Sequence, residues 1–121
     1  MKITITVRTQ FNGLHNWPQC PHEQVRFLRH PHRHVFYVTA TLNIPHLNRQ
    51  VEFIIFQQKL DAIIKQSYPF WEGHYELNNR SCEMVAAELF RTLTVMYSYD
   101  VAKVTVSEDG IFDGTIEKED I

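Results

Sequence analysis

The sequence lacks a long apolar run, a basic excess and a cysteine framework, and each absence excludes a class of protein. Its longest wholly apolar stretch runs only from Phe53 to Phe56, so no membrane span is predicted. Twelve basic residues stand against fourteen acidic ones, a formal charge of -2 that gives no sign of a nucleic-acid partner. The two cysteines, Cys20 and Cys82, are too few for a disulfide framework. The alternating N-terminal residues are unlike a signal peptide, and a cytoplasmic location is expected.

The remaining composition is that of a folded domain with an unusual number of histidines. The chain has 121 residues, of which 44% are hydrophobic and 21% charged, which predicts one domain over residues 1–121. It contains seven histidines. Most of them crowd into one short stretch, as His15, His22, His30, His32 and His34. This cluster is the first feature that points to chemistry rather than to packing.

Hydrophobic periodicity predicts the element order β-β-α-α-β-β. Alternating residues predict strands, and apolar stripes at helical spacing predict helices. The strands are expected at 2–8, 32–43, 101–107 and 111–117, and the helices at 51–66 and from Ser81 to about Ser98. The expected fold class is α+β, with an antiparallel four-stranded sheet and both helices on one face. Such a sheet has two free edges, which are often closed by a neighbouring subunit.

Turn and capping residues mark the connections between these elements. Gly13 and several prolines predict a long connection over 11–31, and such connections are usually functional. Pro69 and Gly73 belong to a second predicted loop, between the helices. Ser81 is the expected N-cap of the second helix, and Asp109-Gly110 predicts a hairpin.

His15, His32 and His34 form a candidate zinc site. His32 and His34 are two residues apart on a predicted strand, so both imidazoles project from the same face. His15 is expected in the preceding loop. Three imidazoles without a fourth protein ligand describe a catalytic zinc site, in which the open position takes water or substrate. The alternative is that one residue of the pair is half-buried and hydrogen-bonded while the other is solvated.

Three further residues are candidates for binding or proton transfer. Cys20 could supply a thiolate beside a metal or an imidazole, or could be a small buried apolar residue. His74, in the inter-helix loop, could move protons or could be polar surface. Glu108 continues the apolar face of its strand, so it either binds something or lies just past the edge of the core.

The order of several short motifs resembles the 6-pyruvoyl-tetrahydropterin synthase / 6-carboxytetrahydropterin synthase family. Phe11-x-x-x-His15 and His32-x-His34 are similar to the two zinc motifs of that family. The segments His74–Asn78, Ser81–Met84 and Val104–Glu108 are similar to its remaining motifs and come in the same order. The resemblance covers nearly the whole chain and agrees with the element order predicted from periodicity.

The resemblance implies a fold, a metal and a substrate class. It implies the tunnelling fold, in which subunits form a homo-oligomer, a trimer or a hexamer, whose sheets close into a barrel. It implies Zn2+ held by His15, His32 and His34, and a pterin substrate, 7,8-dihydroneopterin triphosphate or a relative. The family includes enzymes of tetrahydropterin and queuosine biosynthesis.

The resemblance also implies roles for four other residues. Glu108 would hold the amidine-like edge of the pterin, because a carboxylate can accept two parallel N–H bonds. Glu83 stands at the glutamate of the family's second-helix motif and would also bind substrate. Cys20 and His74 would handle protons, with His74 acting from the neighbouring subunit.

Three positions depart from the family pattern and leave the function open between alternatives. Leu28 stands where the family has its cysteine, Gly73 replaces an aspartate and Arg33 replaces a glycine. A zinc-dependent lyase or synthase is one expectation, and a non-catalytic module that binds pterins or purines is the alternative. A weaker third possibility is an unrelated zinc hydrolase, for which Glu83 or Glu52 would be the first general base to test.

Overall fold

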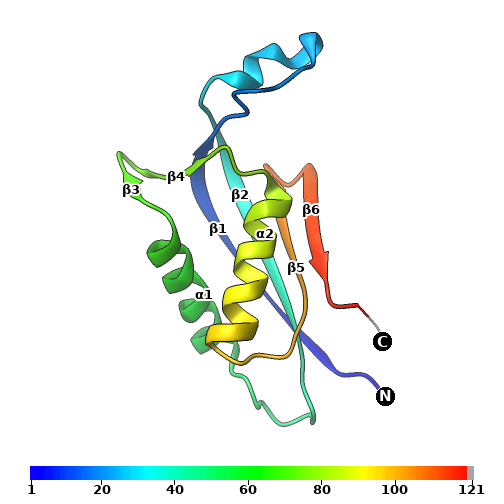
Figure 1. The fold of residues 1–121 in the computed structure, drawn as a ribbon. Helices are drawn as coiled ribbons and strands as arrows, with labels where there is room; N and C mark the ends of the chain where they lie inside the picture. The colour runs from blue at the N-terminus through cyan, green and yellow to red at the C-terminus, as the bar shows by residue number, and fades with distance from the viewer. Residues whose placement is uncertain (120–121) are drawn as a thin grey trace.

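The computed structural model describes residues 1–119 as one twisted sheet with two α-helices packed on the same face (Figure 1). In the sequence, both helices lie between the second and the fifth strand, and their separation from the flanking strands agrees with the predicted α+β class. The strands are β1 Thr4–His15, β2 His32–Asn43, β3 Phe70–Trp71, β4 His74–Asn78, β5 Val101–Glu108 and β6 Phe112–Glu117. The helical elements are η1 Glu23–Arg29, α1 Phe53–Ser67, α2 Cys82–Arg91 and the π-helical turn η2 Thr92–Met96.

The sheet has six strands, so the prediction of a four-stranded antiparallel sheet was wrong. The strand order is β3-β4-β1-β2-β5-β6, and the β1–β4 pair is parallel. The four predicted strands form the contiguous part β1-β2-β5-β6. The two extra strands come from the segment predicted as a loop, where Glu72 and Gly73, with φ of 50° and 88°, turn the chain between them. Hydrophobic periodicity did not indicate these strands, because they are short and are interrupted by turn residues. Closure of the sheet into a barrel between subunits stays a prediction.

β1 continues well past the predicted strand end, so His15 does not lie in a loop. Residues 4–15 pair with β2 without interruption, and the last pair is His15 with His32. Gly13 was taken as a loop signal, but its reason is packing against a neighbouring ring. A Cβ atom at Gly13 would lie 2.6 Å from the aromatic ring of Phe36, so only glycine allows the strand to pass there.

The core lies between the helices and the sheet face that carries the even-numbered residues of β2. Phe36, Val38 and Ala40 are fully buried on that face, as the predicted alternation requires. The helices cover it with the apolar stripes that their spacing predicted. The buried helical residues are Phe56, Leu60, Ile63, Ile64, Cys82, Val85, Ala86, Leu89 and Leu93. This face therefore ends, at the start of β2, at His32 and His34.

The predicted caps and turns are largely confirmed. Ser81 caps α2 by accepting a hydrogen bond from the Met84 amide at 3.2 Å. Asp109 and Gly110 have φ of 56° and 74°, the left-handed pair that a tight hairpin between β5 and β6 needs. The connection after His15 is shorter than predicted and carries η1, which projects beyond one end of the sheet (Figure 1). Within residues 1–119, no helix combines the length and the apolar character needed to span a membrane.

Candidate metal centre and adjoining cavity

Three histidine rings meet where β1 ends and β2 begins. One ring nitrogen from each of His15, His32 and His34 lies within 4.8 Å of the others. His32 and His34 project from the same face of β2, and the β1–β2 register places His15 directly opposite His32. The strand pairing therefore brings together the three residues that the sequence singled out as metal ligands.

Each of the three rings has its Nδ1 atom engaged by an oxygen acceptor. The partners are the carbonyl oxygens of Arg80 for His15 at 2.9 Å and of His30 for His32 at 2.8 Å, and the Asp109 carboxylate for His34 at 2.6 Å. Because carbonyl and carboxylate oxygens only accept, Nδ1 carries the proton in each neutral ring. The Nε2 lone pairs are consequently left for another partner, as is usual for metal-binding histidines.

Two of the three free nitrogens are buried and have no hydrogen-bond partner. His15 is only 8% exposed, and the Nε2 atoms of His15 and His34 are buried without a donor or acceptor. Burial lowers the pKa of the His15 ring below its ordinary value of 6.5, which keeps the ring neutral. Neutral imidazoles with unused lone pairs suit Zn2+, for which three protein ligands and one open position are typical of catalytic sites. The residues present therefore fit a zinc ion.

Glu108, at the end of β5, places its carboxylate against two of these rings. Its Oε1 lies 3.4 Å from Nε2 of His15, and its Oε2 lies 3.7 Å from Nε2 of His34. Cys82 is buried beside it, and burial together with the Glu108 charge raises the pKa of the Cys82 thiol to about 12. Cys82 therefore stays a protonated thiol next to a carboxylate, not a thiolate.

A cavity of about 390 Å³ opens beside the histidines. Its wall includes His15, His32 and Glu108, together with Glu83 from the first turn of α2. The apolar part of the wall includes Trp17, before η1, and Leu28, within η1. The cavity thus combines candidate metal ligands, two carboxylates and an apolar wall in a space that suits a small heterocycle.

Comparison with known proteins shows which solved structures have a similar architecture. The sequence matches no protein-family model and no curated protein sequence. The structure is similar to that of Caenorhabditis elegans 6-pyruvoyl tetrahydropterin synthase, with a TM-score of 0.71, 15% identity and coverage of 98% of this chain and 97% of that one. The Plasmodium falciparum 6-pyruvoyl tetrahydropterin synthase gives a TM-score of 0.65 at 14% identity, over 97% of this chain and 98% of that one. The chain has the fold of the 6-pyruvoyl tetrahydropterin synthases.

The structure is also similar to that of an uncharacterized protein from Wolinella succinogenes. Its TM-score is 0.65 at 14% identity, with 98% of this chain and 99% of that chain covered. The match over almost the full length of each chain confirms, at the level of the fold, the resemblance drawn from the motifs.

Within this synthase fold, Cys20 does not line the cavity. The residue is fully buried, and its Sγ atom faces the carbonyl oxygens of His22 and Val25 at 3.9 and 3.8 Å. Its own carbonyl accepts a hydrogen bond from Nε of Arg29 at 2.9 Å. These contacts order the connection around η1 and match the alternative of a small buried residue, so proton transfer by Cys20 stays a prediction. The residues of this connection that line the cavity include Trp17 and Leu28.

His74 lies on the opposite face of the sheet from the three histidines. On β4, Leu77 is fully buried and Tyr75 packs edge-on against Phe11, with ring centroids 5.5 Å apart, so both face the core. His74 therefore points the other way, where Nε2 lies 3.4 Å from Oε1 of Glu76 and both ring nitrogens lack a hydrogen-bond partner. Arg33, His34 and Asp109 line a hollow together with it. Within one chain His74 does not share the cavity, and its role in proton transfer stays a prediction.

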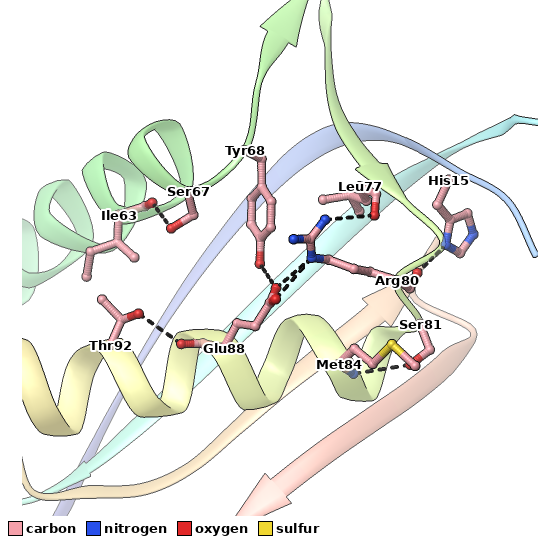
Figure 2. Close-up of polar contacts among 10 residues, drawn as sticks. All are labelled: His15, Ile63, Ser67, Tyr68, Leu77, Arg80, Ser81, Met84, Glu88 and Thr92. Carbon is pink, nitrogen blue, oxygen red and sulfur yellow. Dashed lines mark hydrogen bonds and ion pairs between the residues drawn. The ribbon is translucent and has the colours of Figure 1, made fainter.

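Two residues that hold the histidines were not predicted from the sequence. Asp109 was taken only as a turn residue, although an acidic residue directly after Glu108 was a signal that could have been used. Arg80 contributes a backbone carbonyl, and no residue type signals that role. Figure 2 shows this carbonyl contact with His15 and the polar contacts around the Arg80 side chain.

Proposed function

We propose that this protein is a zinc-dependent pterin lyase or synthase that acts on 7,8-dihydroneopterin triphosphate or a related pterin. The observation that carries the proposal is the meeting of three histidine rings, each with its Nδ1 engaged by an oxygen acceptor, beside a cavity whose wall includes His15, His32 and Glu108. The fold shared with the tetrahydropterin synthases supports the substrate class.

Different residues would bind the metal and orient the substrate. Zinc, when bound by His15, His32 and His34, would act as a Lewis acid toward the side-chain oxygens of the substrate. Glu108 would accept two N–H bonds from the amidine-like edge of the heterocycle and so fix its orientation. Leu28 would contact the ring and keep water from that wall of the cavity.

Glu83 is the second proposed substrate-binding residue. It lies in the first turn of α2 and lines the cavity. A carboxylate at a helix N-terminus is stabilised by the helix dipole, and its oxygens can accept hydrogen bonds from a ligand. We place Glu83 beside the substrate and not on the metal.

Proton transfer is proposed for Cys20 and His74, with His74 acting across a subunit boundary. His74 lies on the sheet face away from its own cavity, so a second copy of the chain would have to bring its ring to the site. This requirement fits the proposed homo-oligomer, a trimer or hexamer in which exposed sheet edges such as β3 are closed by a neighbour.

Release of triphosphate tests the enzymatic proposal directly. Protein loaded with Zn2+ is incubated with 7,8-dihydroneopterin triphosphate, and triphosphate is measured over time beside a metal-free sample. The proposal expects release that depends on zinc. Equal release in both samples, or none in either, contradicts it.

A second candidate function, binding without turnover, is favoured by one observation. Leu28, which lines the cavity from the η1 connection, cannot transfer a proton, whereas Cys20 is buried against backbone carbonyls. A module that keeps the pocket but lacks the chemistry would bind pterins or guanine-type ligands in calorimetry and release no triphosphate. Absence of binding to either ligand class would remove both candidates.

A further inference from the structure

We propose that Arg80, Glu88 and Tyr68 are positioning residues for the metal site, because together they fix the carbonyl oxygen that holds Nδ1 of His15. The inference rests on the proposed metal site and assigns a task to three residues outside the ligand set. Figure 2 shows the three side chains and the carbonyl contact with His15 in one view.

The Arg80 side chain is held by two acceptors. Its Nε donates to both carboxylate oxygens of Glu88, at 2.9 and 3.0 Å, and its Nη1 donates to the Leu77 carbonyl at 3.2 Å. Glu88 in turn accepts a hydrogen bond from the Tyr68 hydroxyl at 2.7 Å. Charge-assisted bonds of this kind are stronger than neutral ones, so the guanidinium has a defined position.

Tyr68 anchors this network from a buried position. The residue is the C-cap of α1 and only 3% exposed, and the Arg80 guanidinium lies 5.2 Å from its ring centroid. Burial, followed by the hydrogen bond to Glu88, raises the pKa of the Tyr68 phenol, which therefore remains a donor. Glu88 belongs to α2. The network thus joins the end of α1, the middle of α2 and the loop between β4 and α2.

In the loop before α2, the Arg80 carbonyl takes no part in the hydrogen bonds of the helix. Asn78 has a left-handed φ of 54°, and the Arg80 amide closes a turn on the Leu77 carbonyl at 3.1 Å. The first helical bond of α2 is accepted by the Ser81 carbonyl, from Val85 at 3.1 Å. The Arg80 carbonyl is therefore outside the helix ladder and is directed at Nδ1 of His15, at 2.9 Å.

The position of that carbonyl decides which nitrogen of His15 can bind a metal. With the acceptor in place, the proton stays on Nδ1 and Nε2 is free. If the Arg80 side chain is released, the carbonyl can turn away, and the neutral ring can then carry its proton on Nε2, where it blocks coordination. The network acts on the metal through the tautomer of one ligand, not by contact with it.

Zinc affinity in three variants tests the inference, measured by competition with a chromophoric chelator. Glu88→Gln removes the ion pair, Arg80→Gln removes the guanidinium, and Tyr68→Phe removes one hydroxyl and is the mildest change. Each is expected to weaken zinc binding, by about tenfold for the first two, as for other residues that orient a metal ligand. The matched control is Thr92→Val, which removes the hydrogen bond from Thr92 Oγ1 to the Glu88 carbonyl at 2.9 Å within the same helix. Its zinc affinity should equal that of the wild type.

A second measurement on metal-free protein separates the inference from the proposed function. In 15N spectra of the imidazole rings, wild-type His15 should carry its proton on Nδ1, and the Glu88→Gln and Tyr68→Phe variants should show a mixture of tautomers. If the wild type binds zinc and these variants bind it equally well, the inference is overturned and the proposed function stands. If the wild type binds no zinc, the proposed function fails, and an unchanged tautomer in the variants would then overturn the positioning role as well.

Discussion

Asp109 holds His34 through one carboxylate oxygen and the backbone of β2 through the other. Its Oδ2 lies 2.6 Å from Nδ1 of His34, and its Oδ1 accepts a hydrogen bond from the Val35 amide at 2.9 Å. These bonds, the one from His34 first, lower the pKa of the Asp109 carboxyl. The turn between β5 and β6 therefore sets the orientation of a ring at the start of β2.

The substitution Asp109→Asn should weaken zinc binding without unfolding the protein. Asparagine tolerates the left-handed φ of 56° at this position, and its carbonyl oxygen can still accept from the Val35 amide. Its NH2 group would then face Nδ1 of His34 as a donor and would force the ring proton onto Nε2. We expect a loss of about tenfold to a hundredfold in zinc affinity, measured by chelator competition. Unchanged affinity would show that Asp109 does not orient the ring.

Glu108→Gln should abolish tight binding of pterins. An amide can accept only one of the two parallel N–H bonds and presents a donor to the other, so about 3 kcal/mol, or about a hundredfold in affinity, should be lost. Calorimetry with a pterin measures the effect, and Glu117→Gln, at an exposed position on β6, serves as the control. Wild-type affinity in the Glu108 variant would remove this residue as the anchor of the heterocycle.

Leu28→Cys distinguishes an enzyme from a binding module. Leu28 lines the cavity four residues before His32, at the position where the resembled family has its cysteine. If the wild type lacks turnover because this wall is apolar, a thiol there should raise triphosphate release above that of the wild type. A matched Leu28→Ser variant tests whether a thiol is required. If Cys20→Ser abolishes release in the wild-type background, the buried thiol takes part after all.

Stability of the metal-free protein should fall as the solution is made acidic, and His15 should account for part of the loss. Burial holds the pKa of folded His15 below 6.5, so the unfolded chain binds a proton at higher pH than the folded chain does. The contribution is therefore fully present above pH 6.5 and decreases as the pH falls from there toward the lowered folded value. Urea unfolding at several pH values measures it. In His15→Gln this part of the slope should vanish, and an unaltered slope would contradict the assignment.

The sequence predicted the fold class and the grouping of three histidines as candidate metal ligands, because both depend on simple periodicities. Alternation in β2 placed His32 and His34 on the face that continues into the core, and the helical stripes identified the covered side of the sheet. The extra strands β3 and β4 were not predicted, because they are short and are separated by a turn at Gly73. They exist because β1 extends past Gly13 and pairs with Tyr75, and long-range pairing leaves no local signal.

The support of the site could be predicted far less well than its ligands. Asp109 acts across a hairpin, and Arg80 acts through its carbonyl and through a network of side chains that is distant in sequence. Cys20 and His74 were singled out for their chemistry, yet one is buried in the η1 connection and the other lies across the sheet. Sequence spacing could not show whether a side chain lines the cavity or points away from it.

Zinc content is the measurement that tests the central claim most directly. Protein purified without chelators is analysed for metal, beside a variant in which His15, His32 and His34 are all replaced by alanine. The account predicts about one zinc per chain in the wild type and none in the variant. Equal zinc in the two proteins, or none in the wild type after incubation with the ion, would contradict it.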